Sequence, residues 1–227
     1  MASTPTAAEW ESAIRSNQTD TIRALYPGRP DVDEATDHGK TALMAAAAAG
    51  DAELVVELLE QGADPAATNR LGGSVLMYAI GGRDRATIRL VLDTGVPLDG
   101  QASNGWGAVM MAAARNDAET IAMLGARGAD PNAQDVYGWT PLMRAVYLRN
   151  AAAAKSLLSL PELDLARANR NGQNVLHLAV IGGEPELVQA LLARGVEQIT
   201  DLNGYTPQGI AGELGREDLL ALLTEQH

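Results

Sequence analysis

The most constraining feature of the sequence is a glycine that returns at an almost constant interval. Successive members are separated by 33, 33, 33, 34 and 32 residues. A period of this length is typical of chains built from stacked copies of one small unit, in which each copy buries its apolar side against its neighbours. The turn glycines are Gly39, Gly72, Gly105, Gly138, Gly172 and Gly204.

The residues after each turn glycine predict a helix. Glycine accepts positive φ in a tight turn, a Thr such as Thr41 two residues later can cap a helix, and Pro141 or Pro207 fits a first helical turn. Eleven residues after the turn glycine, the helix is expected to end in the left-handed conformation, which costs more for Arg83 and Arg149 than for glycine or asparagine. The residues at that position are Gly50, Arg83, Asn116, Arg149, Gly183 and Gly215.

A second amphipathic stretch follows in each copy. Leu54, Val55, Leu58 and Leu59 show the i, i+1, i+4, i+5 spacing of one apolar helical stripe. The stretch at 62–65, Gly-Ala-Asp-Pro, cannot extend a helix. Each copy therefore reads as turn, helix, tight loop, helix and loop.

The repeated phrase resembles the ankyrin repeat. It is most complete at Gly138-Trp139-Thr140-Pro141-Leu142-Met143 and is shared by residues 39–44, 172–177 and 204–207. The resemblance implies an all-α ankyrin-repeat solenoid of stacked helix-turn-helix units with short β-hairpin-like finger loops. Subtracting one period places Trp10, Ala13, Asn17, Ile22 and Leu25 in a first, degenerate copy.

We expect a disordered tail at 1–8 and a single array of about seven copies over 9–227. No linker supports the alternative of two globular domains. The expected copies are 9–35 (an N-terminal cap), 36–68, 69–101, 102–134, 135–168, 169–200 and 201–227 (a C-terminal cap).

Composition excludes several function classes. The net charge of −12 argues against nucleic acid and anionic membranes and permits a basic partner. The absence of cysteine excludes disulfides, thiolate catalysis and cysteine-based zinc sites. No long apolar run or leader is visible, so we expect a cytoplasmic protein, or a periplasmic or secreted one if a leader has been removed. Two lysines against fifteen arginines suggest a GC-rich, bacterial source.

Catalytic, metal and cofactor motifs are incomplete. Gly39-Lys40-Thr41 resembles the end of a phosphate-binding loop, but Glu34 stands where that loop needs a glycine. The acidic residues at 31–37 with His38 miss the spacing of a calcium loop. His177 takes the histidine slot of the family phrase, where we expect a hydrogen-bonded structural role. We therefore expect no catalytic residue, no metal and no cofactor.

Methionine fills that histidine slot in four consecutive copies. Met44, Met77, Met110 and Met143 could form an adaptable binding groove, or they could fill irregular gaps in the core. We favour the core, because each precedes a small residue, such as Ala46 in the second copy, at which neighbouring helices should approach closely.

The resemblance also implies where a partner would bind. The residues two and one before the turn glycine, and one, nine and ten after it, line the concave face in ankyrin-like proteins. Aromatic residues gather there in the fourth and fifth copies, with Arg115 and Arg149 in register, a composition typical of interface hot spots. The alternative is that the rings pack on each other and stiffen the array. The candidate partner-binding residues are His38, Lys40, Trp106, Arg115, Tyr137, Trp139, Tyr147, Leu148, Gln173 and Tyr205.

The same copies carry irregularities. Gly107 replaces a capping Thr, Gly125 replaces an apolar helix residue, and the loop at 159–164 is one residue longer than its counterparts. We expect lower local stability there.

The sequence favours a non-catalytic, monomeric module that binds another protein through its concave face and finger loops. A dedicated inhibitor or immunity-type protein that occludes one enzyme or toxin is the main alternative. A small-molecule binder or an enzyme would need titratable groups that converge in a pocket.

Overall fold

The computed structural model of the chain describes residues 6–29 and 31–224. Within these ranges the chain forms fourteen α-helices and one 3-10 helix, with an isolated bridge between Thr68 and Ser74 and no strand. This confirms the all-α repeat fold expected from the sequence. Residues 1–5 of the expected tail lie outside the described part. The first helix begins at Ala7, where the Thr6 hydroxyl accepts a hydrogen bond from the Glu9 amide.

The chain divides into two compact units, Met1–Met111 and Ala112–His227, and the division falls inside α7 (Ala108–Ala114). The first unit contains α1 (Ala7–Arg15), α2 (Thr19–Leu25), η1 (Tyr26–Gly28), α3 (Ala42–Ala49), α4 (Ala52–Glu60), α5 (Val75–Gly82) and α6 (Arg85–Asp93). The second contains α8 (Ala118–Ala126), α9 (Pro141–Tyr147), α10 (Ala151–Leu158), α11 (Val175–Gly182), α12 (Pro185–Leu192), α13 (Pro207–Glu213) and α14 (Glu217–Thr224).

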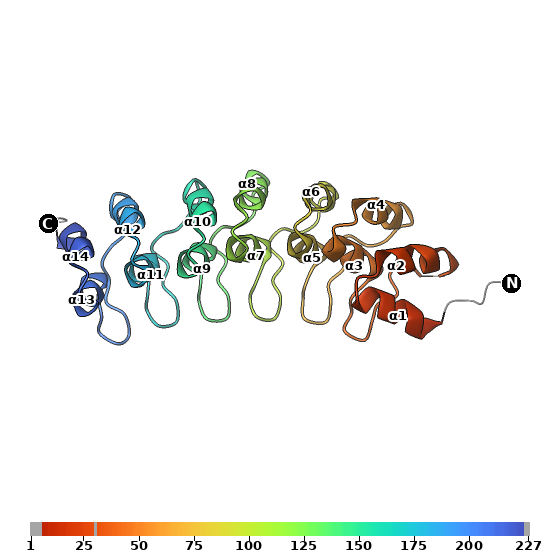
Figure 1. The fold of residues 1–227 in the computed structure, drawn as a ribbon, viewed down its shortest axis with the longest axis horizontal. Helices are drawn as coiled ribbons and strands as arrows, with labels where there is room; N and C mark the ends of the chain where they lie inside the picture. Colours follow the sequence, from red (N-terminus) through yellow and green to blue (C-terminus); the bar gives the residue numbers. More distant parts are fainter. Residues whose placement is uncertain (1–5, 30, 225–227) are drawn as a thin grey trace. The chain divides into compact units, whose positions relative to one another are not determined.

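Each unit has the same layers. A finger loop leads into a loop-side helix, and the chain then turns into a back helix (Figure 1). The loop-side helices pack on one another, α3 on α5 in the first unit and α9 on α11 on α13 in the second. The back helices form the next layer, with α4 on α6, α8 on α10 and α12 on α14. The finger loops of a unit therefore project from the same side, beside its loop-side helices.

Polar caps define where the helices begin. The Thr140 hydroxyl accepts a hydrogen bond from the Met143 amide at 3.2 Å, and Thr41 does the same for Met44 at 3.3 Å. The back helix α4 is capped by Asp51, whose carboxylate accepts from the Leu54 amide at 2.9 Å. These bonds satisfy amides that have no partner inside the helix. The two threonine caps confirm the prediction from the sequence, which did not include the Asp51 cap.

The turn glycine is needed for two reasons, which Gly138 illustrates. Its φ is +76°, a conformation that favours glycine. A Cβ atom at this position would also lie 3.0 Å from the backbone nitrogen of Arg170, in the next finger loop. That nitrogen donates to the Tyr137 carbonyl at 3.0 Å. The glycine thus lets successive finger loops approach closely enough to form a backbone hydrogen bond.

The methionine slots belong to the core, as expected. Met44, Met77, Met110 and Met143 are all buried. His177 is also fully buried, with Nδ1 2.8 Å from Asn174 Oδ1 and Nε2 3.2 Å from the Tyr205 carbonyl oxygen. Its predicted structural role is confirmed.

The first copy packs as the period predicts. Trp10, Ala13 and Ile22 are buried, and the Trp10 indole donates to the Glu34 carbonyl at 3.1 Å. Asn17 has a φ of 54°, so it ends its helix in the left-handed conformation. The array therefore begins with α1 and α2.

The long loop after α10 compensates for the missing side chain at Gly125. A Cβ atom on Gly125 would lie 2.5 Å from Leu160 Cδ2. Leu160 therefore occupies the space that a larger residue in α8 would fill. Two of the irregularities offset each other, and the expected loss of packing at Gly125 is smaller than the sequence alone indicates.

Candidate partner-binding surface

The side chains around Trp139 form a compact cluster in the second unit. The Trp139 and Tyr147 rings meet edge to face, with centroids 5.1 Å apart and planes at 80°. On the same indole lies the Arg144 guanidinium, 4.8 Å from the ring centroid. Both contacts are of the kind that fixes an aromatic side chain in place. The cluster joins the finger loop of the fifth copy to α9.

Beneath this cluster lies Asp135, whose side chain is fully buried. Its Oδ1 accepts hydrogen bonds from the amides of Tyr137 and Trp139, both at 2.9 Å. Its Oδ2 pairs with Arg144 at 2.7 Å. One carboxylate thus fixes the finger loop and the cation that supports Trp139.

Sequence reasoning missed Asp135 and Arg144. The available signal was the position three residues before each turn glycine, where most copies carry a side-chain oxygen that accepts amides of its own finger loop. The residues at that position are Thr36, Asn69, Ala102, Asp135, Asn169 and Asp201. Asn69 shows the same pattern in the first unit, accepting from Leu71 at 2.9 Å and Gly73 at 2.8 Å.

Large apolar side chains are exposed on the loop side of the second unit. Tyr137 is 65% exposed, Tyr147 59% and Leu202 77%. They lie on the finger loops and on α9, whose neighbour α11 adds Ile181 at the equivalent position. We call this surface the aromatic face. It consists of Val136, Tyr137, Trp139, Tyr147, Leu148, Ile181, Leu202 and Tyr205.

Gln173 and Tyr205 belong to one finger-loop arrangement. The Gln173 amide donates to Asp201 Oδ2 at 3.3 Å, and Asp201 Oδ1 accepts from the amides of Asn203 and Tyr205, both at 2.9 Å. The hydrogen bond from the Tyr205 backbone is the main cause that lowers the pKa of Asp201. The carboxylate is therefore ionised and holds the last finger loop. Gln173 is half-buried, whereas Tyr205 stays exposed.

The candidates in the first unit have different surroundings. His38 is exposed, and its carbonyl accepts from the Arg70 amide at 3.0 Å. The Lys40 ammonium is turned inward, where it donates to Asn17 Oδ1 and to the Arg15 carbonyl. Burial lowers the pKa of Lys40. Lys40 thus ties the second copy to the first.

The remaining candidates are Trp106, Arg115 and Leu148. Trp106 is half-buried in the first unit, and its amide donates to Asn104 Oδ1 at 3.0 Å. Arg115 follows α7 in the second unit and is exposed. Leu148 is exposed at the end of α9. The structure therefore brings Trp139 and Tyr147 into contact, and places Trp106 in the other unit.

Two arginines end their helices in the left-handed conformation. Arg83 has a φ of 66° and Arg149 a φ of 56°. Gly50 and Gly183 occupy the equivalent positions with similar positive φ values. The sequence predicted these departures, and both arginine side chains are exposed.

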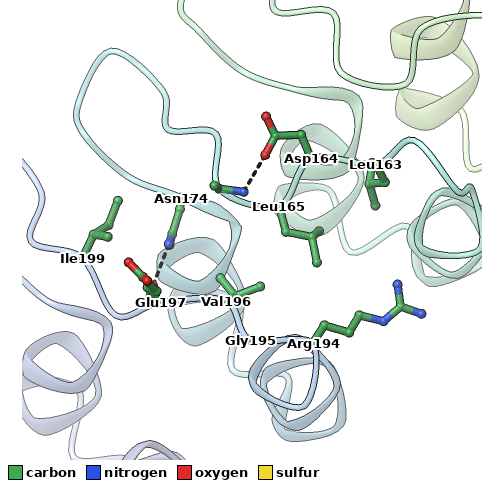
Figure 2. Close-up of a pocket in the computed structure, with 10 residues that line it drawn as sticks. Leu163, Asp164, Leu165, Asn174, Arg194, Gly195, Val196, Glu197 and Ile199 are labelled. Carbon is green, nitrogen blue, oxygen red and sulfur yellow. Dashed lines mark hydrogen bonds between the residues drawn. The ribbon is translucent and has the colours of Figure 1, made fainter.

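A cavity of about 460 Å³ lies away from the aromatic face, between the loops at 163–166 and 194–199 (Figure 2). Asp164 accepts from the Ala166 amide at 3.0 Å, and Asn174 donates to the Glu197 carbonyl at 2.8 Å. Arg194 donates to the Leu158 carbonyl. These polar side chains of the cavity lining are therefore engaged in hydrogen bonds with the backbone. None of the candidate partner-binding residues predicted from the sequence lines the cavity.

A groove of about 620 Å³ runs between the back helices α10 and α12. Ala154, Leu158 and Leu187 contribute apolar surface to it, and Lys155 and Glu186 are among its charged residues. It belongs to the back-helix layer, away from the finger loops. It is the main competing surface of the second unit.

Across residues 6–29 and 31–224, His, Asp and Glu side chains form no group of three or more that could hold a metal ion. Over the same described residues, no helix has both the length and the apolar character needed to cross a bilayer.

Comparison with known proteins agrees with the repeat pattern. A family model described as "Ankyrin repeats (3 copies)" matches residues 11–100 and 76–169, and one described as "Ankyrin repeat" matches residues 171–207. Over 64 residues the chain is 36% identical to the potassium channel AKT1 of Arabidopsis thaliana, a match that covers 28% of this chain and 8% of the channel. Ankyrin repeats generally mediate protein–protein interaction and are typically non-catalytic. The chain belongs to the ankyrin repeat family.

Proposed function

We propose that this chain is a non-catalytic module that binds a partner protein through the aromatic face of its second unit. The observation that carries the proposal is the exposure of large apolar side chains on one side of that unit. Tyr137, Tyr147 and Leu202 are each more than half exposed, and none of them belongs to the buried core. An apolar patch of this kind marks an interaction site in a folded protein.

The support beneath the aromatic face also favours binding. Asp135 and Arg144 fix the finger loop and the Trp139 ring, and Tyr147 packs on that ring at its edge. A surface that is already ordered loses less conformational entropy when a partner docks. Trp, Tyr and Arg are the residues that contribute most to protein interfaces. The packing of the rings on each other, expected as an alternative to binding, instead prepares the surface for it.

The acidic residues next to the face support a non-catalytic role. Asp135 and Asp201 both accept amide hydrogen bonds of their own finger loops. In Asp201 these hydrogen bonds lower the pKa and favour the ionised form, which reduces its value as a proton donor. These carboxylates position the loops.

Site-specific photocrosslinking in cells that produce the protein tests the proposal. A photoreactive phenylalanine analogue replaces Tyr137 or Tyr147 in separate variants, and Lys155 on α10 in a control variant. Lys155 is exposed and lines the back-helix groove. We expect protein adducts from positions 137 and 147 and few from 155. Adducts that form only from 155 would assign binding to the groove and contradict the proposal.

The number and the masses of these adducts also distinguish an adaptor from an inhibitor, and a monomer from a dimer. An adaptor should give adducts with several proteins, whereas an inhibitor or immunity-type protein should give one stoichiometric adduct. A monomeric module should give no adduct at twice its own mass of 23.8 kDa. Gel electrophoresis under denaturing conditions gives the masses of the intact adducts, and mass spectrometry after tryptic digestion identifies the proteins in them.

A further inference from the structure

The charge of the candidate surface is opposite to that of the chain. The whole protein has 29 acidic and 17 basic side chains. The surface positions lie two and one residues before each turn glycine, and one, nine, ten and eleven residues after it. In the second unit, Glu213 is the acidic residue among them. The basic residues at these positions of that unit are Arg115, Arg149 and Arg170.

We infer that the partner segment bound by the aromatic face is acidic and carries apolar side chains between its carboxylates. The inference rests on the proposed function and specifies the chemistry of the partner. The net charge of −12 would by itself favour a basic partner. Local contacts depend on the charges at the interface, because charges farther away are screened by salt.

Two exposed arginines border the fifth-copy part of the aromatic face, which is formed by Val136, Tyr137, Trp139, Tyr147 and Leu148. Arg170 lies in the turn at the tip of the next finger loop, and its amide donates to the Tyr137 carbonyl at 3.0 Å, so the two residues are neighbours. Arg149 directly follows α9, after the exposed residues Tyr147 and Leu148. Both arginines are exposed. An extended segment that crosses the face would therefore meet a cation at either end.

Arg115 extends the basic character to the preceding copy. The Asn150 side chain donates to the carbonyls of Ala113 at 2.9 Å and Ala114 at 3.0 Å. This contact joins the end of α7 to the loop after α9. Arg115 thus precedes Asn116, which is the counterpart of Arg149 in the adjacent copy.

Three acidic residues of the second unit bear on this charge. Glu184 is near Arg149, whose charge opposes the rise that burial causes in the pKa of Glu184. Asp135 is buried and paired with Arg144, so it does not face a partner. Glu213 lies at the end of α13, in the last copy. Among the surface positions of the second unit, basic residues therefore outnumber acidic ones.

The backbone at Arg149 provides a second observation. The left-handed conformation is unfavourable for arginine, and the other copies of the second unit and its border fill this position with Asn116, Gly183 or Gly215, although Arg83 shares it in the first unit. A residue kept in a costly conformation suggests a functional role for its side chain. A guanidinium can pair with a carboxylate through two hydrogen bonds and can stack on aromatic rings. These are the interactions that an acidic, apolar segment would use.

A random library of 12-residue peptides displayed on phage, selected on the full chain, tests the inference. Clones are first sorted by whether they lose binding to the double variant Tyr137→Ser and Tyr147→Ser, which identifies those that use the aromatic face. We expect these clones to be rich in Asp and Glu, with Leu, Tyr, Trp or Phe between them. Synthetic peptides of the same sequences then give the affinities.

The arginine variant is Arg149→Asn with Arg170→Gln, because asparagine is native at the equivalent position of another copy. Its matched control is Lys155→Gln with Arg167→Gln, which removes the same charge from exposed side chains outside the surface positions. We expect the arginine variant to weaken peptide binding by about tenfold or more and the control by less than about twofold. Circular dichroism and Tm establish that both variants are folded.

Two results would overturn the inference in different ways. Face-dependent peptides that are neutral or basic, or that bind the arginine variant as tightly as the parent, would disprove the acidic preference and leave the proposed function standing. Selected peptides that all bind the tyrosine variant unchanged would contradict the proposed function, and the inference with it.

Discussion

Asp135 shows how one buried carboxylate can organise a surface that it does not itself reach. Its two oxygens accept from the amides of Tyr137 and Trp139 and pair with Arg144. Arg144 in turn contacts the Trp139 ring, and that ring contacts the Tyr147 ring. Residues of the face are thus held by groups beneath it.

Asp135→Ala should therefore destabilise the protein by about 3 kcal/mol, because it leaves the buried side of Arg144 and two loop amides without this acceptor. Asp135→Asn should cost less, since asparagine holds the equivalent loops at Asn69 and Asn169. Urea denaturation measures both changes in the free energy of unfolding. Equal losses for the two variants would show that only the charge of Asp135 matters.

His177 makes the sixth copy sensitive to acid. Burial is the main cause that lowers its pKa below the usual value of about 6.5. The folded state therefore binds this proton less readily than the unfolded state. The contribution of neutral His177 to the stability of the folded state is complete above pH 6.5, and it is lost as the pH falls toward the lowered pKa.

The Tm of the parent protein should thus decrease between pH 7.5 and pH 5.5 by more than that of His177→Gln. His38→Gln is the matched control, because His38 is exposed on a finger loop, and it should follow the parent. Thermal unfolding by circular dichroism gives the three profiles. An unchanged pH dependence in His177→Gln would contradict this role of the buried imidazole.

At the scale of elements, most of the helix framework could be predicted from the sequence. The caps at Thr41 and Thr140, the left-handed ends at Arg83 and Arg149 and the buried methionines all depend on local spacing or on the repeat period. The positions of these features recur with the period, so a copy with a clear pattern predicts the structure of the less regular ones.

Other features could not be predicted, because they depend on contacts between neighbouring segments. The ion pair of Asp135 with Arg144 joins a finger loop to the helix after it. Lys40 turns toward Asn17 in the previous copy. The packing of Leu160 over Gly125 depends on the path of the longer loop. None of these partners is fixed by the period alone.

The contact of Leu160 with Gly125 gives a prediction at the element scale. Leu160→Ala should cost about 1–2 kcal/mol, less than a fully buried leucine, because Leu160 is half-buried. Gly125→Ala should destabilise the parent, where its Cβ would meet Leu160 Cδ2. In the Leu160→Ala background it should stabilise α8 by about 0.5–1 kcal/mol, because alanine is the better helix former.

A double-mutant cycle by urea denaturation measures this reversal. Additive effects of the two substitutions would show that Leu160 does not fill the space at Gly125.

At the scale of the whole molecule, the turn glycines continue with the same period from the first unit into the second, and the division falls inside α7. We propose that residues 9–227 unfold as one array, because each copy depends on its neighbours for burial.

Single-tryptophan variants test the proposal. One keeps only Trp10 and the other keeps only Trp139, with the remaining tryptophans changed to Phe. Within each variant, the urea midpoint measured by tryptophan fluorescence should equal the midpoint measured by circular dichroism. Different midpoints for the two probes within each variant would indicate two separate domains.

The molecule as a whole is acidic, yet its loop-side surface carries arginines and exposed tyrosines. We therefore expect binding to depend on where the charges and rings lie on the repeats more than on the total composition. Surface residues are free of the requirements of the core, so the family fold does not determine the partner.

Hydroxyl-radical footprinting tests the central claim most directly, because it reports the accessibility of individual side chains. The full chain is labelled alone and with a saturating selected peptide, and the modified residues are quantified by mass spectrometry. The account predicts strong protection of Tyr137, Tyr147 and Leu202, with Leu158 and Leu187 of the back-helix groove unchanged. Protection of the groove leucines with undiminished labelling of the tyrosines would contradict it.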